Sequence, residues 1–135
     1  MTSAEEFLGL DIGSSRIGVA RGSSAARLSE PLKTIPAKEA IDELAALVEK
    51  YKPAAIVVGL PRNLGGNETD QTDKVRQWVD EAKKSLNLPF YWQDEALTSH
   101  LAEVRGTAQN QSDAAAAAII LQDFLDASKD DRVEA

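Results

Sequence analysis

Three acidic residues, far apart in the sequence, are the side chains best suited to chemistry in this chain. Asp11 interrupts an apolar run, Glu95 follows another, and Asp113 precedes five consecutive alanines. A carboxylate inside an apolar strand is costly unless it is paired or binds a metal, and Mg²⁺ and Mn²⁺ prefer carboxylate oxygens. Two such ions about 4 Å apart can activate a water molecule and stabilise the leaving oxygen of a phosphodiester. If the fold brings them together, the three acids predict metal-assisted hydrolysis.

Each acid also has a simpler interpretation, which the residues alone leave open. Asp11 could cap the turn that follows it. Asp94 and Glu95 are neighbours on a predicted strand, so at most one of them faces the crevice of Asp11, and both could be solvated. Asp113 could do no more than stabilise the N-terminus of a helix. The case for chemistry therefore depends on three acids converging.

The loop at 61–67, with the sequence PRNLGGN, is the first candidate for contact with a phosphate. Its glycines allow the backbone to approach an anion, and Arg62 and Asn63 carry suitable donors. An ordinary strand-to-helix turn is the alternative. Outside this loop, Arg16 is a further candidate for substrate contact. It belongs to a stretch at 7–38 with five basic and two acidic residues, a net charge of +3.

The elements that must position these residues follow from the apolar pattern. Apolar runs bounded by turn residues predict strands at 7–12, 16–20, 31–35, 54–60 and 90–93. Apolar residues at helical spacing and helix-capping signals predict helices at 37–51, 72–86, 98–105 and 113–127, the last capped by Ser112 after a polar loop at 107–111. The charged segment 128–135 is expected to be a frayed tail.

The order of these elements predicts an α/β fold in a single domain spanning 1–135. Three strands in an antiparallel meander precede two parallel strands, which gives a mixed five-stranded sheet with helices on both faces. Right-handed crossovers place the strand at 54–60 beside the strand at 7–12. Ligands of such sheets bind beyond the carboxyl ends of adjacent strands, where Asp11, the loop at 61–67 and Glu95 all fall.

Composition limits the classes of function that remain. The chain has 135 residues, no cysteine and a formal net charge of −7. Disulfides and thiolate metal sites are therefore excluded, and the charge argues against strong non-specific binding to nucleic acid. The start at 1–6 carries two acids and lacks the basic region of a signal peptide, and no apolar run approaches the ~20 residues of a membrane span. A cytoplasmic protein that does not bind membranes is expected.

Four blocks of the sequence resemble the bacterial YqgF family. They are GLDIG at 9–13 with RIGVA at 16–20, VVGLPRNLGG at 57–66, DEALT at 94–98 and DAAAAAIIL at 113–121. The family has a ribonuclease H-like three-layer fold, and its members are described as nucleases of pre-16S ribosomal RNA and as Holliday-junction-resolvase-like. The resemblance implies a metal-dependent nuclease that uses Mg²⁺ or Mn²⁺. It places the catalytic, metal-binding acids on Asp11, Glu95 and Asp113.

Two departures from the family pattern bear on substrate binding. The third block usually has Arg after Asp-Glu, and here Ala96 replaces it. The missing guanidinium removes a bidentate phosphate contact, which Arg62 or Arg105 could supply instead. The first hairpin usually continues with Ser-Asp, where this chain has Arg21 and Gly22, so no role of that family acid is carried over.

The leading hypothesis is an endonuclease that matures the 5′ end of the small-subunit ribosomal RNA, with pre-rRNA or a small-subunit precursor as its partner. The alternatives are a resolvase of four-way DNA junctions, which works as a dimer, and a non-catalytic ribosome-assembly factor with the same fold. An actin-like or sugar-kinase-like ATP binder is disfavoured, because 135 residues cannot supply its two domains. The sequence leaves open whether the protein is a monomer or a homodimer.

Overall fold

The computed structural model describes residues 5–62, 67–96, 109–127 and 129–135, and all structural statements refer to them. Their elements are β1 (Glu6–Ile12), β2 (Arg16–Ser23), β3 (Leu28–Pro36), the 3₁₀ turn η1 (Ala37–Glu39), α1 (Ala40–Tyr51), β4 (Ala55–Arg62), α2 (Asp70–Ser85), β5 (Phe90–Ala96), α4 (Gln109–Asp126), η2 (Lys129–Asp131) and β6 (Val133–Glu134). The helix expected at 98–105 lies outside the described residues. None of the described helices is long and apolar enough to cross a membrane.

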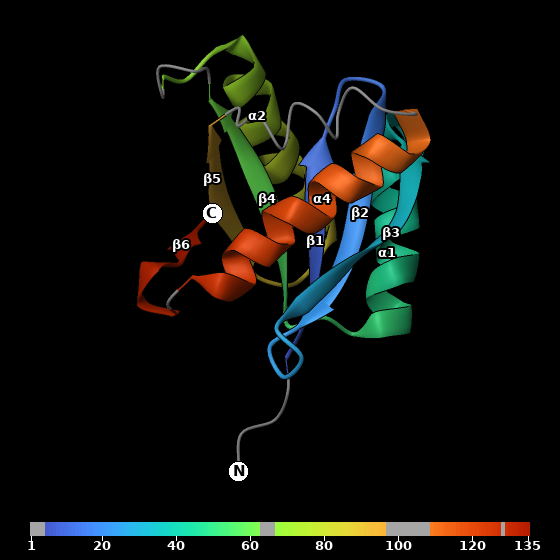
Figure 1. Cartoon of the computed structure of the whole chain (residues 1–135). Helices are drawn as coiled ribbons and strands as arrows, with labels where there is room; N and C mark the ends of the chain where they lie inside the picture. The colour runs from blue at the N-terminus through green and yellow to red at the C-terminus, as the bar shows by residue number, and fades with distance from the viewer. Residues whose placement is uncertain (1–4, 63–66, 97–108, 128) are drawn as a thin grey trace.

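One mixed sheet carries the fold, with strand order β3-β2-β1-β4-β5-β6. The first three strands are antiparallel, β4 runs parallel to β1, and β5 runs parallel to β4. The predicted meander and the predicted place of β4 beside β1 are confirmed. Helices α1 and α2 cover one face, and α4 crosses the other (Figure 1).

Alternation along β1 separates two apolar cores. Leu8 and Leu10 pack into the larger core with α1 and α2, while Phe7 packs into the smaller core against α4. Asp11 follows Phe7 by four residues and therefore belongs to the α4 face, since strand side chains alternate with period two. An acid in this strand thus reaches the edge of the smaller core without crossing the larger one.

Close approach of α4 to the sheet depends on residues with little or no side chain. A Cβ at Gly9 would lie 2.7 Å from the Cβ of Leu121, and a Cβ at Gly18 would overlap the carbonyl of Asp113. On the helix side, Ala114, Ala116 and Ala117 are at most 5% exposed. Glycines on the sheet and alanines on the helix therefore let the two backbones lie nearly in contact.

Two expectations about the C-terminal third are wrong. The sheet has six strands rather than five, because the expected frayed tail forms η2 and β6, and β6 pairs antiparallel with β5. The guanidinium of Arg132 lies 4.5 Å from the ring centroid of Phe124, and the amide of Ala135 donates to the carbonyl of Phe90 at 2.8 Å. A charged segment can be ordered when a long side chain covers aromatic rings.

The second correction concerns the start of α4. The helix begins at Gln109, so Ser112 lies inside it and is not its N-cap, and 109–111 are not loop. Polar residues such as Gln and Asn lower helix propensity only slightly, so their polarity did not locate the boundary. Asp113 stands within the helix rather than in its first turn, and the helix-terminus interpretation of this acid loses its basis.

Candidate active site

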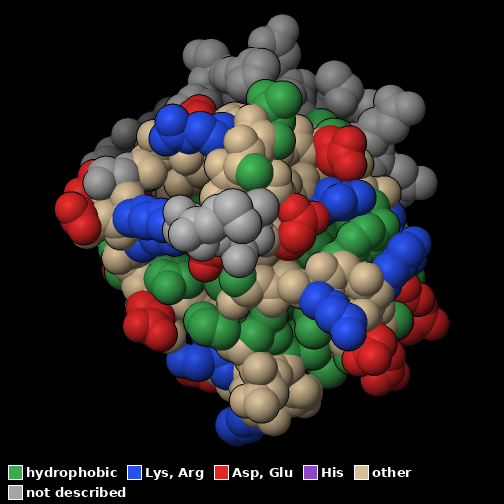
Figure 2. Space-filling model, turned by 90° about the horizontal axis from the view of Figure 1, so that it is seen from below, with side chains coloured by type: hydrophobic (Ala, Val, Ile, Leu, Met, Phe, Trp, Pro, Cys, Tyr) green, Lys and Arg blue, Asp and Glu red, His purple; other side chains and the backbone are tan. Residues whose placement is uncertain are grey.

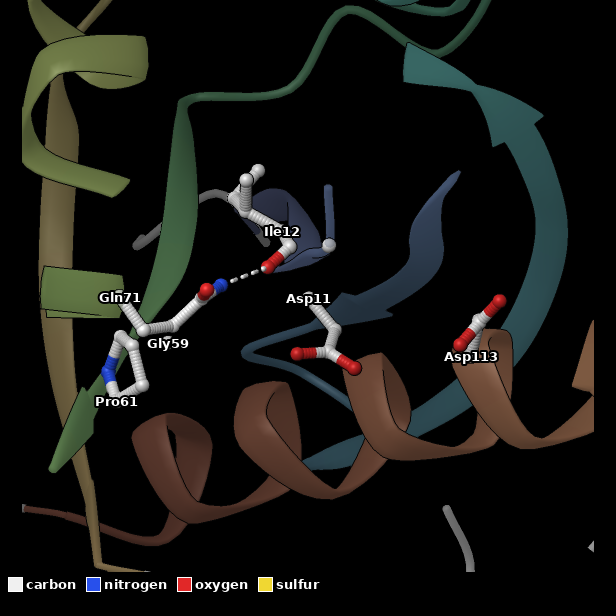
Figure 3. Close-up of a pocket in the computed structure, with 7 residues that line it drawn as sticks. Asp11, Ile12, Gly59, Pro61, Gln71 and Asp113 are labelled. Carbon is white, nitrogen blue, oxygen red and sulfur yellow. Dashed lines mark hydrogen bonds between the residues drawn. The ribbon is translucent and has the colours of Figure 1, made fainter. Parts of the chain in front are cut away.

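A hollow of about 320 Å³ lies beside the carboxyl ends of β1 and β4, where the topology predicted a ligand crevice. It is lined by Asp11, Ile12, Gly13, Gly59, Pro61, Gln71 and Asp113. The six residues labelled in Figure 3 come from β1, β4, α2 and α4, and Gly13 directly follows β1. Four elements that are distant in the sequence therefore meet at one site.

Asp11 is placed by β1, which lies between β2 and β4 in the sheet. It pairs with Gly18 across the antiparallel β1–β2 ladder, and its carboxylate is directed toward the α4 side of the sheet (Figure 3). The residue is partly buried. A carboxylate carried by a paired strand has a fixed backbone, which suits a ligand that must hold its geometry.

Asp113 reaches the same hollow from α4 because Gly18 allows it. The missing side chain of Gly18 leaves the space that the backbone of Asp113 fills. Gly18 is also the ladder partner of Asp11, so one glycine brings the two acids together. The convergence of Asp11 and Asp113, expected from the sheet order, is therefore observed, and their catalytic role stays a prediction.

Arg16 contacts Asp113 rather than lying open for substrate. Its Nε donates to Oδ2 of Asp113 at 2.7 Å, across 97 residues of sequence. The side chains are 36% and 20% exposed, respectively, so the pair stands at the rim of the hollow. Such charge-assisted hydrogen bonds are about twice as strong as neutral ones.

Gln71 is a residue at the hollow that sequence reasoning missed. It lies in the first turn of α2, which begins at Asp70, two residues before the predicted start. Its Nε2 donates to the carbonyl of Ile12 at 3.4 Å, as Figure 3 shows. Thr72 fixes this turn by donating to the carbonyl of Pro61 at 2.5 Å. The available signal was the polar pair before the predicted helix, since helix N-termini face the strand ends in this architecture.

Glu95 is located by its backbone alone. It is paired with Pro61, a residue that lines the hollow, while its side chain lies outside the described residues. The side chain of Arg62 and the whole of Asn63 also lie outside them. Asp94 is exposed and lines a different hollow together with Trp92 and Arg76, so it does not belong to the site of Asp11.

No cluster of three or more His, Cys, Asp or Glu suited to a metal ion occurs among the described side chains. Asp11 and Asp113 supply two carboxylates, and the third predicted ligand, Glu95, is not among the side chains searched. The donor set is nonetheless one of hard oxygens only, which is the chemistry that Mg²⁺ and Mn²⁺ prefer. The residues present therefore fit such an ion.

Three of the five basic residues at 7–38 pair with acidic residues in the part of the chain that the structure describes. Arg16 pairs with Asp113, Arg21 pairs with Glu6 and Glu30, and Lys33 pairs with Glu43. At the end of the molecule where β1 begins, acidic and basic side chains are interspersed (Figure 2). The described side chains at that end therefore form no patch of one sign that would attract a nucleic acid.

The sheet order and the helices on both faces give this chain a ribonuclease H-like fold. Two solved structures have this fold. *Thermus thermophilus* RuvC in complex with a Holliday junction substrate aligns with a TM-score of 0.59 and 16% identity, covering 97% of this chain and 99% of that one. A second *Thermus thermophilus* RuvC structure aligns with a TM-score of 0.56 and 18% identity, covering 96% and 99%.

Residues 5–127 match the RuvX family, described as Holliday junction resolvase, and the chain belongs to this family. A relative from *Rickettsia akari* is 37% identical over 134 residues, covering 91% of this chain and 87% of its own length. One from *Rickettsia typhi* is 38% identical over 136 residues, covering 93% and 87%. Both are named "Putative pre-16S rRNA nuclease". The resemblance to the YqgF family is confirmed.

Proposed function

We propose that the protein is a metal-dependent endonuclease that cuts the precursor of 16S ribosomal RNA near its 5′ end, in the cytoplasm. The observation that carries the proposal is the convergence of Asp11 and Asp113 on one hollow at the carboxyl ends of β1 and β4. The names of its relatives support pre-16S rRNA as the substrate, and the family supports cleavage of a phosphodiester. The isolated RNA or a small-subunit precursor would be the partner.

Asp11, Glu95 and Asp113 would hold the ions, Mg²⁺ or Mn²⁺. Glu95 is on β5, and β4 separates this strand from β1. Two strand spacings amount to about 10 Å between backbones. Carboxylates on these two strands would therefore be close enough to hold the ions between them. When bound, the ions would supply Lewis-acid activation of water and stabilisation of the leaving oxygen.

The chain's own residues would bind and orient the substrate. Asp11 pairs with Gly18 on β2, and the preceding Leu10 pairs with Val58 on β4, so the attacking and leaving groups would meet a rigid site. Arg62 and Asn63, from the end of β4 and the segment after it, would contact the phosphate backbone. Arg16, already at the rim of the hollow, would add a cationic donor.

A junction resolvase is the second candidate, and the family description favours it. A resolvase must cut two symmetric strands, so it would act as a homodimer with two sites. A ribosomal RNA nuclease has no such requirement. The oligomeric state of the active species therefore separates the two candidates.

Cleavage assays on matched substrates test the proposal. The purified protein is incubated with an RNA that spans the 5′ end of 16S RNA and its precursor extension, and separately with a four-way DNA junction. Each reaction contains Mg²⁺, Mn²⁺ or a chelator. We expect metal-dependent cleavage of the RNA, lost by at least about 100-fold in Asp11→Asn. Preferential cutting of the junction by a dimer would favour the second candidate.

A matched variant tests whether the loss of any acidic residue from α4 reduces cleavage. Asp123 lies on α4, the helix of Asp113, but is exposed. Asp113→Asn should abolish cleavage, and Asp123→Asn should cut at the rate of the parent protein. Full metal-dependent activity in both Asp11→Asn and Asp113→Asn would exclude this hollow as the active site.

A further inference from the structure

We propose that Arg16 is a positioning residue that holds Asp113 while the site lacks metal and is displaced from it when a divalent ion binds. The inference rests on the proposed function, because it takes Asp113 as a metal ligand. It adds that binding of the metal ion releases the guanidinium of Arg16 from Asp113, so that this side chain can contact the substrate. Arg16 thereby has two successive partners, a carboxylate and then a phosphate.

The contact geometry gives Arg16 control over Asp113. Its Nε reaches Oδ2 of Asp113 at 2.7 Å, the range of a charge-assisted hydrogen bond. The Asp113 side chain is 20% exposed, and its backbone is pressed against Gly18. With the backbone fixed by the glycine and one oxygen fixed by the guanidinium, the carboxylate has few orientations left.

The charges around the hollow explain why a cation is needed there. Asp11 and Asp113 both line it, and none of the described lining residues is Lys or Arg. Carboxylates brought together repel one another unless a positive charge stands between or beside them. The guanidinium of Arg16 supplies that charge from the rim. A divalent ion would supply it from within the hollow.

The guanidinium of Arg16 and a bound divalent ion would repel each other if both stayed beside Asp113. The guanidinium and a bound divalent ion are both positively charged, so movement of the guanidinium would relieve their repulsion. Arg16 is the first residue of β2, and its side chain is 36% exposed, so a displaced guanidinium would move toward solvent. A released guanidinium matches a phosphate in shape and charge, so it would remain at the site as a substrate contact.

Binding of Mn²⁺ to the full chain without nucleic acid tests the inference. Isothermal calorimetry compares the parent protein with Arg16→Gln, which removes the competing charge, and Arg16→Lys, which keeps it. We expect Arg16→Gln to bind Mn²⁺ about tenfold more tightly because a nearby positive charge is lost. Arg16→Lys should bind within about twofold of the parent protein, since the charge remains.

Arg21→Gln is the matched control. Arg21 is on the same strand, its side chain is 35% exposed, and it pairs with Glu6 and Glu30 instead of an acid of the hollow. Five residues of strand separate it from Arg16, about 17 Å, so its removal should leave Mn²⁺ affinity unchanged. Equal tightening in Arg16→Gln and Arg21→Gln would show a general charge effect and overturn the inference.

A purely structural role for Arg16 predicts the opposite sign. If Arg16 only orients Asp113 as a ligand, Arg16→Gln binds Mn²⁺ more weakly, and unchanged or weaker binding overturns the inference. Failure of the proposed function looks different, because the parent protein would then bind no divalent ion or Asp11→Asn would bind it equally well.

A second measurement covers the case in which Arg16→Gln does not fold. The Nε–H resonance of Arg16, assigned by its absence in Arg16→Lys, is followed by NMR in the parent protein as Mg²⁺ is added. We expect the resonance to shift and to exchange faster with water as the bond to Asp113 breaks. A resonance unmoved at saturating Mg²⁺ overturns the inference.

Discussion

Replacing Gly18 with Ala should displace the helix that carries Asp113. The added Cβ would overlap the carbonyl of Asp113 and lie 2.8 Å from the amide nitrogen of Ala114. Both contacts are with backbone, which cannot rotate away as the end of a side chain can. Overpacking typically lowers the free energy of unfolding by about 1–3 kcal/mol. Because both contacts are with backbone, we expect a loss of about 3 kcal/mol. For a domain of this size the melting temperature should fall by about 10 °C.

Activity should fall further than stability alone explains. A shift of about 1 Å in a catalytic group can cost about 100-fold in rate, and a loss of about 3 kcal/mol still leaves most molecules of an ordinary domain folded. Gly18→Ala should therefore be folded by circular dichroism, with Mn²⁺ affinity and RNA cleavage both reduced. The measurements are urea unfolding, calorimetry with Mn²⁺ and the cleavage assay.

Gly59→Ala is the matched control for stability. Its Cβ would lie 2.5 Å from Cδ1 of Ile120, the flexible end of a side chain on the same helix. That atom can move, so the expected cost is about 1 kcal/mol. Equal losses of stability in the two variants, or parent-like stability and cleavage in Gly18→Ala, would refute the argument that backbone contact at Gly18 sets the position of Asp113.

Three further predictions concern the framework and the metal. Thr72→Ala removes a buried hydroxyl that donates to Pro61 and should lower the free energy of unfolding by about 2 kcal/mol in urea; a loss under about 0.5 kcal/mol would contradict this. Arg132→Ala removes the guanidinium stacked on Phe124 and should cost about 1 kcal/mol by the same measurement, whereas parent-like stability would show that the C-terminal strand is held otherwise. Mn²⁺ at 100 times its dissociation constant should stabilise the parent protein by about 2.7 kcal/mol but not Asp11→Asn, and equal stabilisation of both would place the ion elsewhere.

The parts of the fold that the sequence predicted are those encoded by local pattern. The apolar run around Asp11 and the turn at Gly13 predicted the β1–β2 hairpin, and handedness placed β4 beside β1. The same reasoning put Asp11 at the end of its strand. These features depend on neighbours in sequence or on rules of chain connection, both of which can be read without coordinates.

The parts that were missed depend on contacts between distant residues. The bond between Arg16 and Asp113 joins positions 97 residues apart, and nothing near either residue indicates it. The C-terminal strand is held by Arg132 against Phe124, whereas its composition alone indicated a solvated tail. Gln71 was missed because α2 begins at Asp70, earlier than its apolar pattern predicted, and this earlier start places Gln71 beside the hollow.

The C-terminal strand also changes how copies of this protein can meet. β5 would otherwise present a row of unpaired backbone groups, which is a template for joining the sheets of two molecules. β6 covers part of that row and is itself two residues long, too short to guide a further strand into register. A homodimer built by extending the sheet past β6 is therefore disfavoured, and two subunits would associate through helices or through β3 at the opposite border.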